Sequence, residues 1–87
     1  ARGNESHDAY DQVLFERLRQ VRYDLAQKHQ VPPFIIFSDA TLRALCRHFP
    51  TTETAFLTIS GVGQKKLSQY GYDFMHAIEA YLAEKDK

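Results

Sequence analysis

The sequence predicts an all-α domain, and three observations lead to that prediction. Apolar residues recur at helical spacing, first at Leu14, Leu18, Val21 and Leu25. One run alone, residues 34–37, has the composition of a strand, and no second run of this kind exists to pair with it. The connections between amphipathic stretches are short, and the chain shows no repeat or low-complexity tract. We therefore expect a compact bundle of five helices.

The first helix is expected from about Asp11 to about His29, because its apolar residues follow one stripe. Pro32-Pro33 ends it, since proline disfavours helix in the residue before it. The run Phe34-Ile35-Ile36-Phe37 follows and has no strand partner. It is expected to form an extended, largely buried connector with some side chains in the core.

The second helix should begin after Ser38, which is a favoured N-cap residue, with Asp39 in its first turn. It should end at Pro50 and face inward with three apolar residues: Leu42, Leu45 and Phe49. Thr51 or Thr52 can cap a short third helix that carries Ala55, Phe56 and Leu57.

The fourth and fifth helices follow a glycine-containing turn at residues 61–63. The fourth carries Leu67 and Tyr70, and Gly71 is expected to break it. The fifth carries the apolar residues Phe74, Ile78, Tyr81 and Leu82.

Length and composition indicate one domain with a single modest core, since the chain has 87 residues and is 44% hydrophobic. Residues 1–9 are expected to be a linker or a cloning remnant, residues 10–83 the domain, and residues 84–87 a charged tail. Cys46 has no cysteine partner for a disulfide or a zinc site, which favours a reducing, intracellular setting in the cytoplasm or nucleoid. No apolar run approaches the roughly 20 residues of a membrane span, so no membrane partner is expected.

The net charge is zero, but the charges are unevenly distributed. Residues 15–72 hold eight basic and four acidic side chains, a balance of +4, whereas residues 1–14 and 73–87 each have a balance of −2. A mildly basic middle permits weak phosphate binding but produces no strong field.

The segment Ile59-Ser60-Gly61-Val62-Gly63-Gln64-Lys65-Lys66-Leu67 carries the first functional signal. Two glycines around one apolar residue form a tight hairpin of the helix-hairpin-helix kind, which can bring backbone N–H groups and a helix N-terminus to a phosphate. Val62 is expected to anchor the hairpin in the core, and Lys65 and Lys66 to add positive charge. The alternative is a helix connection that only reverses the chain.

Several blocks of the sequence resemble the HRDC domain found at the C-termini of RecQ helicases and of ribonuclease D. They are Leu14-Phe15, Leu18-Arg19, the run Val31-Pro32-Pro33-Phe34-Ile35-Ile36-Phe37-Ser38-Asp39-Ala40-Thr41-Leu42, Ile59-Ser60-Gly61-Val62-Gly63, Lys66-Leu67 and Tyr70-Gly71. The resemblance covers about residues 10–83 and is of the bacterial RecQ type. It implies an HRDC-type five-helix bundle without catalytic residues, which helps a helicase to engage single-stranded or structured DNA.

The resemblance also places one candidate contact residue. Many RecQ-type members carry a tyrosine that contacts single-stranded DNA after the proline pair, where this chain has Phe34. A phenyl ring can stack on a base, although it cannot donate a hydrogen bond. The alternative is that Phe34 caps the core.

Basic residues provide the candidate phosphate contacts. Arg19 and Arg22 project from one face of the first helix and, with Lys65 and Lys66, form the favoured phosphate track. Arg43 and Arg47 offer a second patch. The predicted nucleic-acid-binding residues are thus Arg19, Arg22, Phe34, Gly61, Val62, Gly63, Lys65 and Lys66.

No enzymatic activity, metal or cofactor is expected for this chain. Cys46 should be a small buried or half-buried side chain, the histidines fit no metal-ligand spacing, and Tyr23 and the other tyrosines should lie mainly in the core or at its rim. We expect a weak DNA-binding accessory domain of an ATP-dependent RecQ-type helicase, with single-stranded or junction DNA and the helicase core of the same chain as partners. The alternatives are a protein-protein or intramolecular interaction module and an RNA-holding domain of a ribonuclease D.

Overall fold

The computed structural model describes residues 9–86, and these residues fold into helices without a strand. The helices are α2 (Gln12–His29), α3 (Pro33–Ile36), α4 (Asp39–His48), α5 (Glu53–Leu57), α6 (Gln64–Lys66), the π-helical segment η1 (Leu67–Gly71) and α7 (Tyr72–Lys85). The last three follow one another without a break, so residues 64–85 form one helix. The predicted all-α class and the number of five helices are confirmed for these residues, although α3 was not expected and the expected fourth and fifth helices form one. The expected linker at residues 1–9 lies, apart from Ala9, outside the described residues.

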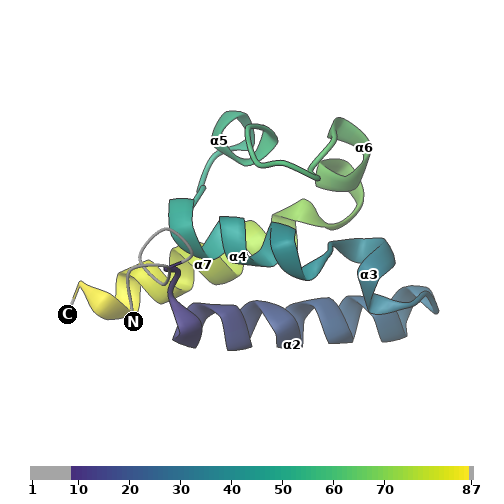
Figure 1. Cartoon of the computed structure of the whole chain (residues 1–87), viewed down its shortest axis with the longest axis horizontal. Coiled ribbons are helices and arrows are strands. Elements are labelled where there is room, and N and C mark those ends of the chain that lie inside the picture. Colours follow the sequence, from purple (N-terminus) through teal and green to yellow (C-terminus); the bar gives the residue numbers. More distant parts are fainter. Residues whose placement is uncertain (1–8, 87) are drawn as a thin grey trace.

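Helix α2 runs along one edge of the molecule, with α4 and α7 packed against it (Figure 1). Helices α5 and α6 lie on the side of α4 that faces away from α2 (Figure 1). The start of α2 is joined to the end of α7, because Tyr81 donates a hydrogen bond to the carboxylate of Asp11 at 2.7 Å. Arg17 and Glu84 pair at 2.7 Å beside this contact. Within residues 9–86, no helix is long and apolar enough to cross a membrane.

Three helix starts are capped by a side chain, and two of these caps, at Ser38 and Thr52, were expected from the sequence. Asp11 accepts from the amide of Leu14 at 3.1 Å, and Ser38 accepts from the amide of Thr41 at 3.2 Å. Thr52, the second of the two threonines considered, accepts from the amide of Ala55 at 3.1 Å. In each case a side-chain oxygen satisfies an amide that has no acceptor within its own helix.

The expectation of an extended connector at residues 34–37 is wrong, because Pro33–Ile36 forms a helical turn. Proline suits the first helical position, and the amide of Ile35 donates to the carbonyl of Pro32 at 3.0 Å. The turn divides the apolar run into two halves. Ile36 and Phe37 are buried, whereas Phe34 and Ile35 are exposed.

The expected break at Gly71 is also wrong. Gly71 lies in η1, which continues directly into α7. A Cβ at Gly71 would stand 2.5 Å from Cδ1 of Leu67, so glycine lets the Leu67 side chain pack onto the backbone within the helix. The wider π turn therefore accommodates a residue that usually ends helices. At the other end, α7 extends through Lys85 into the expected charged tail.

The core draws side chains from nearly every helix and centres on phenylalanine rings. Phe37 contacts Phe74 with ring centroids 5.0 Å apart and Phe56 with centroids 6.3 Å apart. Leu14 and Leu18 of α2 are fully buried in the same cluster. Phe37 thus anchors the end of α3 at the centre of the bundle while the start of α3 stays at the surface.

Candidate nucleic-acid interface

The glycine hairpin between α5 and α6 has the geometry that its sequence predicts. Gly61 has φ +92°, a conformation that residues with a Cβ rarely adopt. Val62 is only 8% exposed and donates its amide to Ile59 at 3.1 Å, so it anchors the hairpin in the core as expected. The hydroxyl of Thr41 donates to the carbonyl of Ser60 at 3.1 Å and ties the hairpin to α4.

The hairpin leads into the N-terminus of the helix that spans residues 64–85. Gly63 is its N-cap and provides no side-chain cap, while its carbonyl accepts from the amide of Leu67 at 2.9 Å. The first amides of a helix have no acceptor within it and carry a partial positive charge, which suits an anion. Lys65 is exposed in the first turn, and Lys66 is half-buried beside it.

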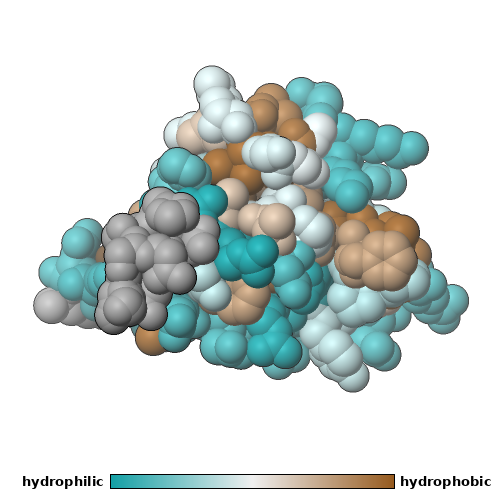
Figure 2. Space-filling view, viewed as in Figure 1, coloured by the Kyte–Doolittle hydropathy of each residue, from teal (hydrophilic) through white to brown (hydrophobic). Residues whose placement is uncertain are grey.

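The buried end of α3 lies close to this helix start. The Nζ of Lys66 is 6.0 Å from the ring centroid of Phe37, the residue that ends α3. Figure 2 shows an apolar surface at the end of the molecule where α3 lies and hydrophilic atoms beyond it toward α6. Helix α3, which carries Phe34, and helix α6, which carries Lys66, therefore lie toward the same end of the molecule (Figure 1).

Phe34 itself is 66% exposed, the highest value among the large hydrophobic residues of the described chain. The alternative in which this ring caps the core is therefore wrong. Its neighbour Ile35 is 40% exposed. An exposed phenyl ring on a short helix offers a flat apolar face to an unstacked base or to an apolar side chain.

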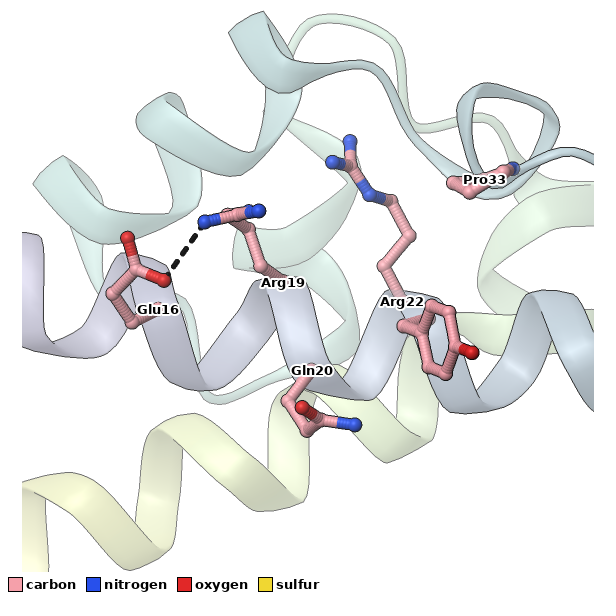
Figure 3. A pocket seen from close by; sticks show the side chains of 6 residues that line it. Glu16, Arg19, Gln20, Arg22 and Pro33 are labelled. Carbon is pink, nitrogen blue, oxygen red and sulfur yellow. Dashed lines mark hydrogen bonds and ion pairs between the residues drawn. The ribbon is translucent and has the colours of Figure 1, made fainter.

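Arg19 and Arg22 extend from the same side of α2, whereas Gln20 points the other way (Figure 3). Arg19 is exposed and pairs with Glu16 at 2.8 Å. Arg22 differs, because its side chain is only 12% exposed and its guanidinium bonds to Phe37 and Asp39, where α3 ends and α4 begins. The two arginines predicted as equivalent thus have different surroundings.

A hollow of about 260 Å³ lies beside these arginines. Its lining residues come from α2 and the start of α3: Glu16, Arg19, Gln20, Arg22, Tyr23 and Pro33. Tyr23 is 54% exposed, so this ring belongs to the surface and was missed as a candidate contact. Residues 16, 19, 20 and 23 are spaced as one stripe of a helix, and this spacing could have indicated from the sequence that Tyr23 lies beside Arg19.

The second basic patch lies elsewhere. Arg47 lines a different hollow, of about 520 Å³, between α4 and α5, together with His48. Neither Arg43 nor Arg47 forms an ion pair with any described residue. The large exposed hydrophobic residues are absent from the lining of this hollow, whereas Tyr23 lines the hollow on α2.

Cys46 is buried on α4, and burial raises the pKa of its thiol to about 12, with a further contribution from the charge of Asp11. Because the thiolate is the reactive form, we expect the native protein to react with Ellman's reagent at pH 8 about a thousandfold more slowly than the chain in guanidinium chloride. Comparable rates in the two solvents would contradict this picture of Cys46. Among residues 9–86, no cluster of histidine, cysteine or acidic side chains has the arrangement of a metal site.

Comparison with known proteins matches a family model described as HRDC domain to residues 11–78. The chain is 43% identical over 74 residues to the ATP-dependent DNA helicase RecQ of Haemophilus influenzae and 44% identical over 73 residues to that of Bacillus subtilis. These alignments cover 85% and 84% of this chain but 12% of each relative, so the chain spans about an eighth of their length. It is also 35% identical over 68 residues to the ATP-dependent DNA helicase UvrD2 of Mycobacterium tuberculosis (strain H37Rv), covering 78% of this chain and 10% of that protein.

A solved structure, the D. radiodurans RecQ HRDC domain 3, has the same fold with a TM-score of 0.77. Its sequence is 33% identical, and the match covers 79% of this chain and 91% of that one.

Proposed function

The chain belongs to the HRDC domain family, and we propose that it binds single-stranded or structured DNA weakly, as a non-catalytic accessory domain of a RecQ-type ATP-dependent DNA helicase. The proposal is carried by the exposure of Phe34 on α3, at the end of the molecule where the lysine-bearing start of the 64–85 helix also lies (Figure 1). A helicase acts on chromosomal DNA, so the proposal also places the domain at the nucleoid, with the helicase core of the same chain as a neighbour.

The proposed interface combines two kinds of contact. Phe34 stacks on a base, which is sequence-tolerant because every base has a π face. The backbone amides that follow Gly61 and the amines of Lys65 and Lys66 receive phosphates. The hydrophobic ring thus orients the strand, and the positive groups hold its backbone.

The charges of this surface favour weak rather than tight binding. Arg19 and Arg22 are each paired with a carboxylate of this chain, whereas Lys65 and Lys66 pair with none of the described carboxylates. Three or four phosphate contacts give log affinity a slope of about −2 to −3 against log salt. We therefore expect micromolar or weaker dissociation constants for a short single strand.

Fluorescence anisotropy of a labelled oligonucleotide at several salt concentrations measures this slope. A signal that does not depend on salt, or no binding at low salt and high protein concentration, would remove the proposed DNA interface.

The double substitution Lys65→Glu, Lys66→Glu should weaken binding by roughly 25-fold at 0.1 M salt and make the salt slope shallower by about 1.4, because two phosphate contacts are lost. The same anisotropy titration measures both changes. Lys28→Glu is the control for charge reversal outside the proposed interface. Lys28 is exposed on α2 and lines a separate hollow between α2 and α7. Equal losses per reversed charge in the double variant and in the control would assign the effect to overall charge rather than to this surface.

A second function is supported by the adjacent exposure of Phe34 and Ile35, which also suits an apolar protein partner or the helicase core. Salt distinguishes the two functions, because binding through these two side chains alone would change little between 50 and 300 mM salt. A salt-insensitive complex with the isolated helicase core, together with no DNA binding, would favour this second function.

A further inference from the structure

Arg22 joins three parts of the molecule. Its side chain leaves α2, Nη1 donates to the carbonyl of Phe37 at 2.9 Å, and Nη2 lies 2.8 Å from a carboxylate oxygen of Asp39. Phe37 ends α3, and Asp39 begins α4. The planar guanidinium therefore spans the junction between these two helices with two separate nitrogen atoms.

Helix α3, which precedes this junction, is too short to be stable by itself. Helix α3 has four residues and no side-chain cap at its N-terminus. A single helical turn is unstable in water, so its position depends on contacts outside it. On one side these are the buried side chains of Ile36 and Phe37, and at its end the bond from Arg22 fixes the backbone.

We propose that Arg22 is a positioning residue that holds α3 and thereby presents Phe34 to DNA, rather than a phosphate contact. This inference rests on the proposed DNA-binding function. The Arg22 side chain is only 12% exposed, and both of its terminal nitrogens already bond to the Phe37 carbonyl and the Asp39 carboxylate, so it offers less to a phosphate than an exposed arginine does. Arg19 is the natural comparison, because it is exposed and, among residues 9–86, bonds only to Glu16 on its own helix.

The salt dependence of binding separates the two roles. Arg22→Met should lower affinity about fivefold, as part of the stacking contribution is lost, while the salt slope stays unchanged. Loss of a phosphate contact would instead make the slope shallower by about 0.7. Arg19→Met is the control, because we expect it to lose a phosphate contact and therefore to make the salt slope shallower. Arg22→Lys keeps the positive charge but lacks the two terminal nitrogens of the planar guanidinium, so its affinity should resemble that of Arg22→Met. Wild-type affinity in Arg22→Lys would overturn the proposal.

Removing the carboxylates that pair with Arg22 and Arg19 gives a second test, because the two changes should shift DNA affinity in opposite directions. Asp39→Asn deletes a negative charge, which on electrostatic grounds alone would strengthen DNA binding. If Arg22 acts as proposed, this change weakens binding about twofold, because the α3–α4 junction loses one of its two bonds. Glu16→Gln, which releases Arg19 in the same way, should strengthen binding by a similar factor. Tighter binding by both variants would overturn the proposal.

Two further measurements connect Arg22 to Phe34. In a Phe34→Ala background, Arg22→Met should have no additional effect on affinity, because the residue acts through the ring. Without any DNA, hydrogen exchange at the amide of Ile35 should accelerate at least tenfold in Arg22→Met, while the amides of α7 keep wild-type rates. Unchanged exchange at Ile35 overturns the positioning role even if the wild-type protein binds DNA. If the wild-type protein binds no DNA, the proposed function is wrong, and Arg22 has no role in presenting Phe34 to DNA.

Discussion

Phe34→Ala should lower the affinity for a single-stranded oligonucleotide by about 5- to 150-fold. Stacking of an aromatic ring on a base contributes about 1–3 kcal/mol by alanine substitution, and Phe34 is the most exposed large hydrophobic residue of the described chain. Anisotropy titration at low salt measures the loss. The salt slope should stay the same, because the ring neutralises no phosphate.

The stability of this variant distinguishes a surface role from a core role. Since Phe34 is 66% exposed, Phe34→Ala should leave the melting temperature nearly unchanged. Ile35→Ala is the matched control on the same helical turn, and we expect a loss of affinity below about twofold because an aliphatic side chain stacks poorly. Phe34→Tyr should retain the stacking. Wild-type affinity in Phe34→Ala would exclude the ring from the interface.

The helix starts were predictable because they depend on local chemistry. Ser38, Asp11 and Thr52 each bond to an amide three residues later, and such contacts need only sequence neighbours. The two wrong expectations involve tertiary packing. The run at residues 34–37 has strand-forming residues, but the bundle buries only its second half, and Gly71 stays helical because Leu67 packs onto it.

The candidate site divides in the same way. The glycine hairpin and the lysines after it were identified as residue types in a local pattern, and the ring at Phe34 was identified from the family resemblance. The structure brings the hairpin helix near the end of α3. The different surroundings of Arg19 and Arg22 were not predictable, because they depend on where α3 and α4 cross α2. Sequence spacing places both on one face, and only the fold decides which guanidinium is covered.

Gly61→Ala should destabilise the domain by about 2–3 kcal/mol, which corresponds to a fall of roughly 10–15 °C in melting temperature for a chain of this size. Gly61 has φ +92°, and a Cβ there would collide with the hydroxyl oxygen of Thr41. That hydroxyl cannot turn away without cost, because it donates to Ser60 and accepts from Ser38. Chemical denaturation with an unchanged m-value measures the loss, and wild-type stability would show that the hairpin relaxes freely.

Gly63→Ala is the control that separates folding from binding. Its φ is −104°, and a Cβ at this position would meet no atom within 4 Å, so the free energy of unfolding should hardly change. The same Cβ would stand in the open space before the first amides of α6, where the proposed phosphate approaches. We therefore expect Gly63→Ala to weaken DNA binding about threefold while the domain stays as stable as the wild type. Equal affinity for both proteins would mean that the strand passes over Phe34 and the lysines without touching the hairpin backbone.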